Sequence, residues 1–198
     1  MPNWDEHRRK GGLLIVLSGP SGVGKDSVLD ELKKIYPALA KCVTMTTRQP
    51  RDGEVDGVDY TFVSVEDFKK RVDEGGFLEY AEVHCNLYGT PRSWVEENLA
   101  QGADIVLKID VQGGLTVKHK MPSAVMVFLL PPSMEELERR LRSRLTETDE
   151  EMSVRLLNAR KELEQISRYD YVIVNDSISK AAEELKAVLI AEHCRIQQ

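Results

Sequence analysis

Leu13-Leu-Ile-Val-Leu17 and the segment that follows it, Ser18-Gly-Pro-Ser-Gly-Val-Gly-Lys25, decide the fold of this chain. Five consecutive apolar residues predict a buried strand, and the glycines after them predict a tight loop. Beyond the lysine, apolar residues recur at helical spacing, at Val28, Leu29, Leu32 and Ile35. A strand, a glycine-rich loop ending in lysine and a helix are together typical of a phosphate-binding loop.

Such a loop binds phosphate mainly through its backbone. Glycine permits positive φ and leaves room for a polyphosphate, while unpaired N–H groups at the start of the helix face the anion. A lysine adds a full positive charge, which argues against the alternative of a tight turn without a ligand. We expect a nucleoside triphosphate to contact Gly19, Pro20, Ser21, Gly22, Val23, Gly24, Lys25, Asp26 and Ser27.

Asp26 departs from the usual form of this loop, in which Ser or Thr follows the lysine and helps to hold Mg²⁺. A carboxylate is also a good ligand for this hard cation. We therefore expect Mg²⁺ as the cofactor and Asp26 as its ligand. Whether the carboxylate contacts the ion directly or through water stays open.

The composition describes a globular protein: of 198 residues, 41% are hydrophobic and 30% charged. A net charge of −6 argues against general binding to nucleic acid or anionic membranes. No apolar run approaches the roughly 18 residues that span a bilayer. Three widely separated cysteines without a C-x-x-C pair favour a reducing, cytoplasmic location. Residues 1–10 are polar and lack the features of a signal peptide, so we expect a disordered tail.

Short elements fill residues 42–104, between longer apolar segments, and predict an inserted lobe. Arg48 and Arg51 flank a proline in a loop rich in glycine and aspartate. Arginine is well suited to bidentate phosphate binding, although two solvated loop arginines are the alternative. We expect a turn at 88–91, with Thr90 capping the helix that follows.

The long apolar strands resume at 105–110, 123–130 and 171–176. Ligands gather at the carboxyl ends of parallel strands, so Asp110 is expected to face the same cleft as Lys25. Asn175, at the end of the last strand, lies where an adenine edge could be bound.

A basic helical hairpin is expected over 133–167, starting with the capping box of Ser133 and Glu136. Arg140 and Arg144 lie one turn apart on its first helix, and Arg155 lies on its second. Beside a phosphate-binding loop, such a hairpin indicates a lid that supplies cations to the transferred phosphoryl group. Arginines that only pair with neighbouring glutamates are the alternative.

Seven segments, in order, resemble the guanylate kinase family from about residue 13 to about 192: SGPSGVGK, TTRQPRDGEVDGVDY, GFLEYAEVHCNLYGTP, IDVQGG, FLLPPS, RSRLTETDEEMSVRL and VIVND. The resemblance implies an α/β fold, with a P-loop kinase core whose parallel sheet is flanked by helices, an inserted mixed-β GMP-binding lobe and a helical lid. The implied bounds are 11–41, 105–132 and 168–198 for the core, 42–104 for the lobe and 133–167 for the lid.

The implied reaction converts ATP and GMP to ADP and GDP with Mg²⁺, in purine nucleotide metabolism, and includes dGMP as an acceptor. ATP and GMP are the expected partners, without nucleic acid or membrane, and the oligomeric state stays open. The resemblance implies catalytic roles for Lys25, Arg48, Arg144 and Arg155, and ATP contacts for Arg140 and Asn175. It implies GMP contacts for Thr44, Arg48, Arg51, Glu54, Tyr60, Glu79, Tyr88, Thr90 and Asp110.

Two further positions depart from the family pattern. Leu145 stands where the family often has glycine, and Lys108 stands where another acid is common. The alternatives to this activity are a non-catalytic, protein-binding module of the same fold and a kinase for another nucleoside monophosphate or a sugar phosphate. A simple nucleoside triphosphatase would leave the lobe unexplained.

Overall fold

The fold is described from a computed structural model that covers residues 11–83, 85–142 and 149–196. The side chains of residues 149–151 are not part of the description. Three sequence-based expectations lie outside the described residues: the disordered tail over 1–10, the catalytic role of Arg144 and the departure at Leu145.

The central sheet consists of four parallel strands in the order β6-β1-β7-β8. Their bounds are Ile105–Lys108 for β6, Leu14–Ser18 for β1, Val125–Leu130 for β7 and Tyr171–Val174 for β8. β1 is buried along its whole length, which explains why its sequence is continuously apolar rather than alternating. Because the four strands run in one direction, their carboxyl ends meet at one edge, where ligands bind in sheets of this kind.

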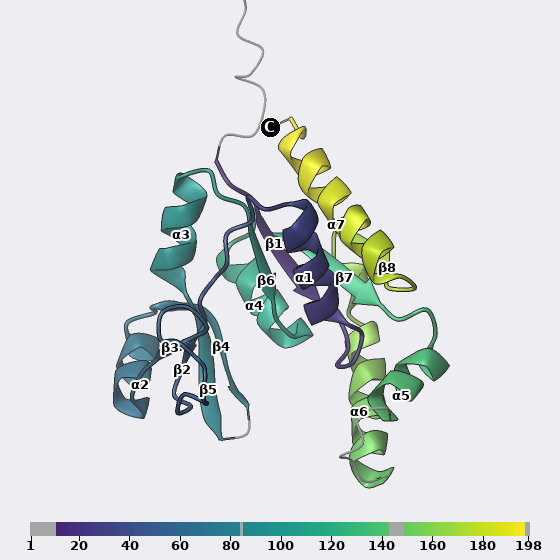
Figure 1. Cartoon of the computed structure of the whole chain (residues 1–198), viewed down its shortest axis with the longest axis horizontal. Coiled ribbons are helices and arrows are strands. Elements are labelled where there is room, and N and C mark those ends of the chain that lie inside the picture. Colours follow the sequence, from purple (N-terminus) through teal and green to yellow (C-terminus); the bar gives the residue numbers. More distant parts are fainter. Residues whose placement is uncertain (1–10, 84, 143–148, 197–198) are drawn as a thin grey trace, which may run out of the picture.

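Four helices cover the two faces of this sheet: α1 (Lys25–Ile35) and α7 (Ile178–His193) on one, and α3 (Arg92–Ala100) and α4 (Val111–Lys120) on the other. Figure 1 shows α1 and α7 side by side. Alternate residues of β1 point to opposite faces, so Ile15 and Leu17 pack with the first pair of helices, and Leu14 and Val16 with the second. The predicted α/β class, with a parallel sheet flanked by helices, is confirmed.

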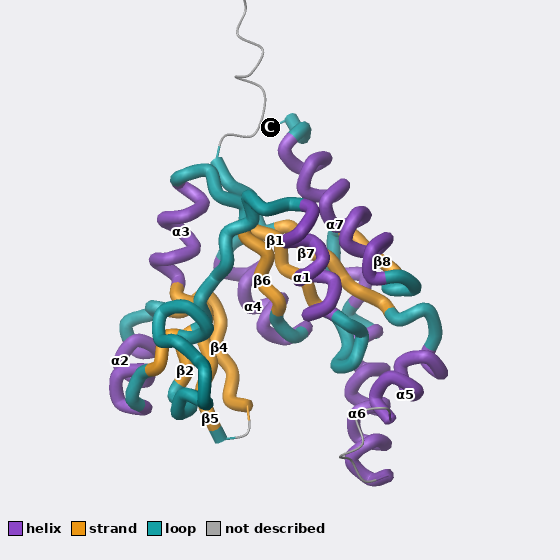
Figure 2. Tube along the Cα trace, in the orientation of Figure 1, coloured by secondary structure: helices purple, strands orange, loops and turns teal. Residues whose placement is uncertain are grey.

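A second sheet of mixed direction lies beside the first (Figure 2). It has the order β3-β2-β5-β4, with β3 Thr61–Phe62, β2 Met45–Thr46, β5 Asn86–Pro91 and β4 Phe77–Val83. α2 (Val65–Asp73) covers it, and Phe68 of this helix stacks on Phe77 at 4.5 Å between ring centroids. The oxygen of Ser64 accepts the backbone N–H of Asp67, the helix cap that the sequence predicts.

The expected turn at 88–91 is wrong, because these residues form the end of β5. Gly89 reads as a turn signal in the sequence, yet a Cβ there would lie 2.7 Å from the ring of Phe77. The glycine therefore makes room for the aromatic core of the second sheet. α3 begins without a side-chain cap, and the Thr90 hydroxyl donates instead to Glu79.

α4 is a helix that the sequence analysis did not predict, because Gly113 and Gly114 read as the end of a strand. Asp110 caps it, since a carboxylate oxygen accepts the backbone N–H of Gly113 at 2.7 Å. A Cβ at Gly114 would lie 2.8 Å from the hydroxyl of Ser18. Glycine thus lets α4 approach the end of β1, which offsets its low helix propensity.

The helical hairpin consists of α5 (Met134–Arg142) and α6 (Asp149–Leu163), followed by the short 3₁₀ helix η2 (Ile166–Arg168). The backbone N–H of Glu136 donates to the Ser133 hydroxyl at 3.1 Å, which confirms the predicted start of α5. Leu141 lies so close to the phosphate-binding loop that a Cβ at Gly22 would be 2.6 Å from its side chain. The hairpin therefore packs directly on the loop.

Asp104 connects four elements at the edge of the central sheet opposite the phosphate-binding loop. It is 5% exposed, and its carboxylate accepts the backbone N–H of Leu13 at 2.8 Å and the Tyr36 hydroxyl at 2.7 Å. The Nε2 atom of His193 lies 2.8 Å from the same carboxylate. A buried acceptor of this kind matters for stability mainly because its removal leaves hydrogen-bond donors unsatisfied, which costs free energy.

We expect Asp104→Ala to lower the free energy of unfolding by about 3 kcal/mol, because it removes the acceptor of the buried Leu13 N–H and of two partly buried groups, on Tyr36 and His193. Urea unfolding followed by circular dichroism measures this change. Asp30→Ala is the matched control, since Asp30 is 71% exposed on α1, and it should change stability by no more than about 0.5 kcal/mol. Equal effects of the two substitutions would contradict the role assigned to Asp104.

Candidate active site

The phosphate-binding loop joins β1 to α1 through backbone conformations that favour glycine. Gly19 has a φ of 148° and Gly24 a φ of 97°. A Cβ at Gly19 would lie 2.3 Å from the carbonyl oxygen of Leu129, and one at Gly24 would lie 2.5 Å from the side-chain nitrogen of Asn175. At both positions, a side chain would clash with neighbouring atoms, and the positive φ also favours glycine.

Lys25 is the first residue of α1, and its ammonium turns back onto the loop. It donates to the carbonyl oxygens of Gly19 and, at 3.1 Å, of Pro20. Burial lowers the pKa of Lys25, and the carboxylates of Glu162 and Asp26 oppose this effect. The loop therefore holds its cation in place with neutral acceptors, which an anionic phosphate can replace.

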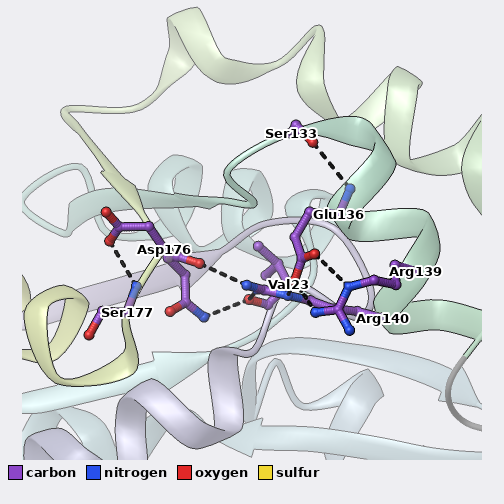
Figure 3. Close-up of polar contacts among 8 residues, drawn as sticks. Val23, Ser133, Glu136, Arg139, Arg140, Asp176 and Ser177 are labelled. Carbon is purple, nitrogen blue, oxygen red and sulfur yellow. Dashed lines mark hydrogen bonds and ion pairs between the residues drawn. The ribbon is translucent and has the colours of Figure 1, made fainter.

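Arg140 of α5 contacts the loop at Val23 (Figure 3), and the side chain of Asn175 bonds to the same residue. The Arg140 guanidinium donates to the carbonyl oxygens of Val23 at 3.3 Å and Asn175 at 3.1 Å, and to Glu136 at 2.7 Å. The Asn175 side chain, 2% exposed, also donates to the Val23 carbonyl, at 2.8 Å. Hydrogen bonds from Arg139 and Arg140 lower the pKa of Glu136 to about 2. α5 and β8 are thus joined through the loop.

A cavity of about 540 Å³ lies between the second sheet and the carboxyl end of β6. Six of the predicted GMP-binding residues line it: Thr44, Tyr60, Glu79, Tyr88, Thr90 and Asp110. Its lining also includes Cys42 and Lys108, which the sequence analysis did not assign to an acceptor site. The structure thus brings residues from both sheets to one hollow, although their sequence positions span more than sixty residues.

Glu79 is the buried acid of this cavity, with 8% of its surface exposed. Its carboxylate accepts the Thr90 hydroxyl at 2.6 Å. Burial raises the pKa of Glu79 and outweighs the lowering by that hydrogen bond. Burial and then the charge of Glu79 raise the pKa of the Cys42 thiol to about 12. Glu79 is therefore a fixed acceptor that lacks a cationic partner of its own in the described hydrogen bonds.

Arg48, Arg51 and Glu54 form a cluster that does not line the cavity. Arg48 donates to both carboxylate oxygens of Glu54, at 2.7 and 2.9 Å, and this bond lowers the pKa of Glu54. The backbone N–H of Arg51 also donates to Glu54, at 2.8 Å. The Arg48 guanidinium lies 5.3 Å from the ring centroid of Tyr60, which lines the cavity. The cluster thus adjoins the cavity, and Glu54 positions the arginine.

Two catalytic positions, Arg144 and Arg155, are predicted for the hairpin. Arg144 is outside the described residues, and Arg155 lies half-buried on α6. Glu162, seven residues further along the same helix, acts electrostatically on Lys25, which the sequence analysis did not predict. Two turns separate Arg155 from Glu162, so both lie on one helix face about 10 Å apart along the axis.

Within the described residues, no three His, Cys, Asp or Glu side chains are grouped as a ready-made metal site. The helices of the same part of the chain are too short or too polar to cross a membrane. The roles of the individual site residues stay predictions at this point.

The sequence matches the family described as guanylate kinase over residues 12–192. A guanylate kinase of Caldanaerobacter subterraneus subsp. tengcongensis is 48% identical over 190 residues, covering 96% of this chain and 92% of that one. A guanylate kinase of Myxococcus xanthus is 49% identical over 185 residues, covering 93% and 88%.

Among solved structures, a guanylate kinase from Anaplasma phagocytophilum superposes with a TM-score of 0.74 at 37% identity, covering 95% of this chain and 89% of that one. The match in fold and the matches in sequence extend over nearly the whole chain, including both sheets and the hairpin. They confirm the resemblance inferred from the seven sequence segments. The chain therefore belongs to the guanylate kinase family, whose reaction is the transfer of a phosphoryl group from ATP to GMP.

Proposed function

We propose that the loop after β1 holds ATP, that the cavity beside the second sheet holds GMP, and that the chain transfers the γ-phosphoryl group between them. The main support for separate ATP and GMP sites is the buried carboxylate of Glu79. It accepts a hydrogen bond from Thr90 in a cavity that Asp110 also lines. Asp110 follows β6, the neighbour of β1, so the acceptor cavity opens toward the carboxyl edge at which the donor loop lies.

Glu79 gives the cavity its preference for guanine. Guanine presents N1–H and an exocyclic amine as donors, which a carboxylate accepts, whereas adenine presents a lone pair at N1. The wrong base would leave the buried carboxylate without donors, at a cost that corresponds to roughly 10²–10⁴-fold discrimination. Thr44 and Thr90 complete the base and nucleotide contacts, with Asp110 beside them.

Arg48, Arg51, Tyr60 and Tyr88 bind the phosphate of GMP in this proposal. The two guanidinium groups neutralise that phosphate, so that one of its oxygens can approach a second anion. Arg48 already lies near Tyr60 and is held there by Glu54. A phosphate then replaces part of an existing set of acceptors rather than ordering a free side chain.

On the donor side, Arg140 and Asn175 bind the adenine of ATP, and the loop cradles its phosphates. Lys25 exchanges the carbonyls of Gly19 and Pro20 for phosphate oxygens. An oxygen of the GMP phosphate attacks the γ-phosphorus of ATP, the bond to the bridging oxygen breaks, and ADP leaves with that electron pair. Lys25, Arg144 and Arg155 stabilise the charge that spreads over the transferred group.

The donor set fits Mg²⁺, which usually keeps several waters and binds through one or two carboxylates and the substrate phosphates. The Asp26 carboxylate, exposed at the mouth of the loop, would hold the ion in exchange for the ammonium of Lys108, which it contacts in the structure. When bound, Mg²⁺ draws charge away from the outer phosphates of ATP. Closure of the lobe over 42–104 and of the lid over 133–167 excludes water and so suppresses hydrolysis of ATP.

We also propose a cytoplasmic location. No disulfide joins Cys42, Cys85 and Cys194, all of which lie in the described part of the chain, and this suits a reducing compartment.

Release of ADP from ATP and Mg²⁺ tests the proposal, with GMP, dGMP, AMP, UMP and dTMP offered in turn. We expect GMP to give the highest turnover and dGMP to react, because the base contacts are the same in both. A faster reaction with AMP or UMP would contradict the assignment of Glu79. Absence of turnover with every acceptor would favour a protein-binding module over a kinase.

Lys25→Met should lower kcat by at least about 10³-fold, because it removes the cation nearest the transferred group. The affinity for GMP, measured by calorimetry, should change by less than about twofold, since Lys25 does not line the acceptor cavity. Lys34→Met, on the exposed face of the same helix, is the control and should keep wild-type turnover. Retained activity of the Lys25 variant would refute its role.

Glu79→Gln should weaken GMP binding by roughly 10–100-fold at pH 8, because it replaces a charged acceptor. The raised pKa of Glu79 means that the wild-type carboxylate takes up a proton at a pH above its ordinary value of 4.5. The part of the GMP affinity that depends on the negative charge of Glu79 is present above the raised pKa of this residue. It is lost as the pH falls through that pKa. The difference between the GMP affinities of wild type and variant should therefore narrow as the pH is lowered from 8 toward the raised pKa of Glu79.

Both proteins experience the same titration of the GMP phosphate, so the ratio of their dissociation constants isolates Glu79. Glu82→Gln is the matched control, because Glu82 lies exposed on the same strand. It should bind GMP like the wild type at every pH. A ratio for Glu79→Gln that is close to one at pH 8 would show that the charge of Glu79 does not contact the base.

A further inference from the structure

Two positions at which the sequence departs from the family pattern contact each other. The ammonium of Lys108, the last residue of β6, donates to the carboxylate of Asp26 in the first turn of α1. The two residues are 82 positions apart in the chain. The parallel register of β1 and β6, in which Leu17 lies opposite Lys108, brings them to the same edge of the sheet.

This ion pair contributes little to the stability of the fold. The Asp26 side chain is 73% exposed and that of Lys108 is 40% exposed. An exposed pair of this kind typically stabilises a protein by less than about 1 kcal/mol, because water screens its charges. Any larger effect of the pair would therefore have to act on the groups that surround it.

What surrounds it is the nucleotide site. Asp26 directly follows Lys25 of the phosphate-binding loop, and Lys108 lines the acceptor cavity two residues before Asp110. Both charges reach the Lys25 ammonium, since Asp26 raises its pKa and Lys108 lowers it. The pair thus lies between the donor and acceptor sides of the site.

At this place, before Mg²⁺ is bound, an uncompensated carboxylate would oppose the function of the loop. A nucleoside triphosphate carries several negative charges, and their repulsion by one carboxylate adds up even where water screens each interaction. An ammonium in contact with the carboxylate cancels most of that repulsion. It also fixes the orientation of a side chain that would otherwise be free to rotate in solvent.

We propose that Lys108 is a positioning residue that neutralises and orients Asp26, so that the two residues act as one unit and allow the loop to accept a nucleoside triphosphate. The inference rests on the proposed function in one respect, that the loop binds ATP. It assigns to Lys108 an effect that passes through Asp26 rather than a contact with the nucleotide.

A double-mutant cycle tests this unit through the affinity for ATP without metal, measured by calorimetry in EDTA. Lys108→Met should weaken binding by roughly tenfold, because it exposes the phosphates to the Asp26 carboxylate. Asp26→Asn should bind at least as tightly as the wild type. In the Asp26→Asn background, the same change at Lys108 should weaken binding by no more than about twofold, since the charge that it compensates is gone.

Two variants serve as controls. Lys108→Arg keeps the charge and should restore affinity to within about threefold of the wild type. Lys34→Met removes the same charge from the exposed Lys34–Glu31 pair on α1 and should leave the affinity unchanged. Thermal unfolding should be nearly the same for all of these proteins, as expected for exposed pairs. Lys108→Gln replaces the methionine variant if the latter aggregates.

Equal weakening by Lys108→Met in both backgrounds would overturn the proposal, because Lys108 would then act on the nucleotide itself. Wild-type affinity of Lys108→Met would also overturn it, because the pair would be an ordinary surface contact. A wild-type chain that does not bind ATP at all would instead refute the donor site of the proposed function. The experiment thus separates failure of this inference from failure of that function.

Discussion

The parallel pairing of β1 with β6 on one side and β7 on the other is the constraint on which the site depends. The loop that follows β1 therefore lies at the edge of the sheet where β6 ends, beside Lys108 and Asp110. The backbone pairing alone is sufficient for this placement. Parallel neighbours require a long connection. Here the connection from α1 to β6 contains the whole second sheet. The cavity that we propose for GMP is thus formed by the same crossover that the parallel sheet requires.

In the described structure, three cations of the proposed site are held by acceptors of the chain itself. Lys25 donates to loop carbonyls, Arg48 to Glu54, and Arg140 to Glu136 and two carbonyls. Each keeps its charge close to where a phosphate or base is proposed to bind, so binding exchanges one acceptor for another. Such an exchange changes the number of hydrogen bonds little, but it avoids the entropy of ordering long side chains.

Local patterns were sufficient to predict the central strands, the phosphate-binding loop and the caps at Ser64 and Ser133, because these depend on neighbouring residues. They failed where glycine serves tertiary packing. Gly89 accommodates the ring of Phe77, and Gly114 lets α4 approach Ser18, yet both read as breaks in the sequence. The acceptor residues followed from the family resemblance, whereas the contact between Thr90 and Glu79 depends on the register of β4 and β5.

A contact between distant residues is also what links Asp26 with Lys108. The sequence alone gives no sign that these two residues meet. Taken alone, Asp26 suggests a metal ligand and Lys108 suggests the loss of an acid. Their contact, across 82 residues, is the observation from which we infer that Lys108 compensates for the charge of Asp26. A charge at a phosphate site is therefore informative only as part of the local sum of charges, because each residue's effect on the nucleotide depends on what its neighbour has already neutralised. That sum is a property of the fold, since strand pairing decides which residues contribute to it.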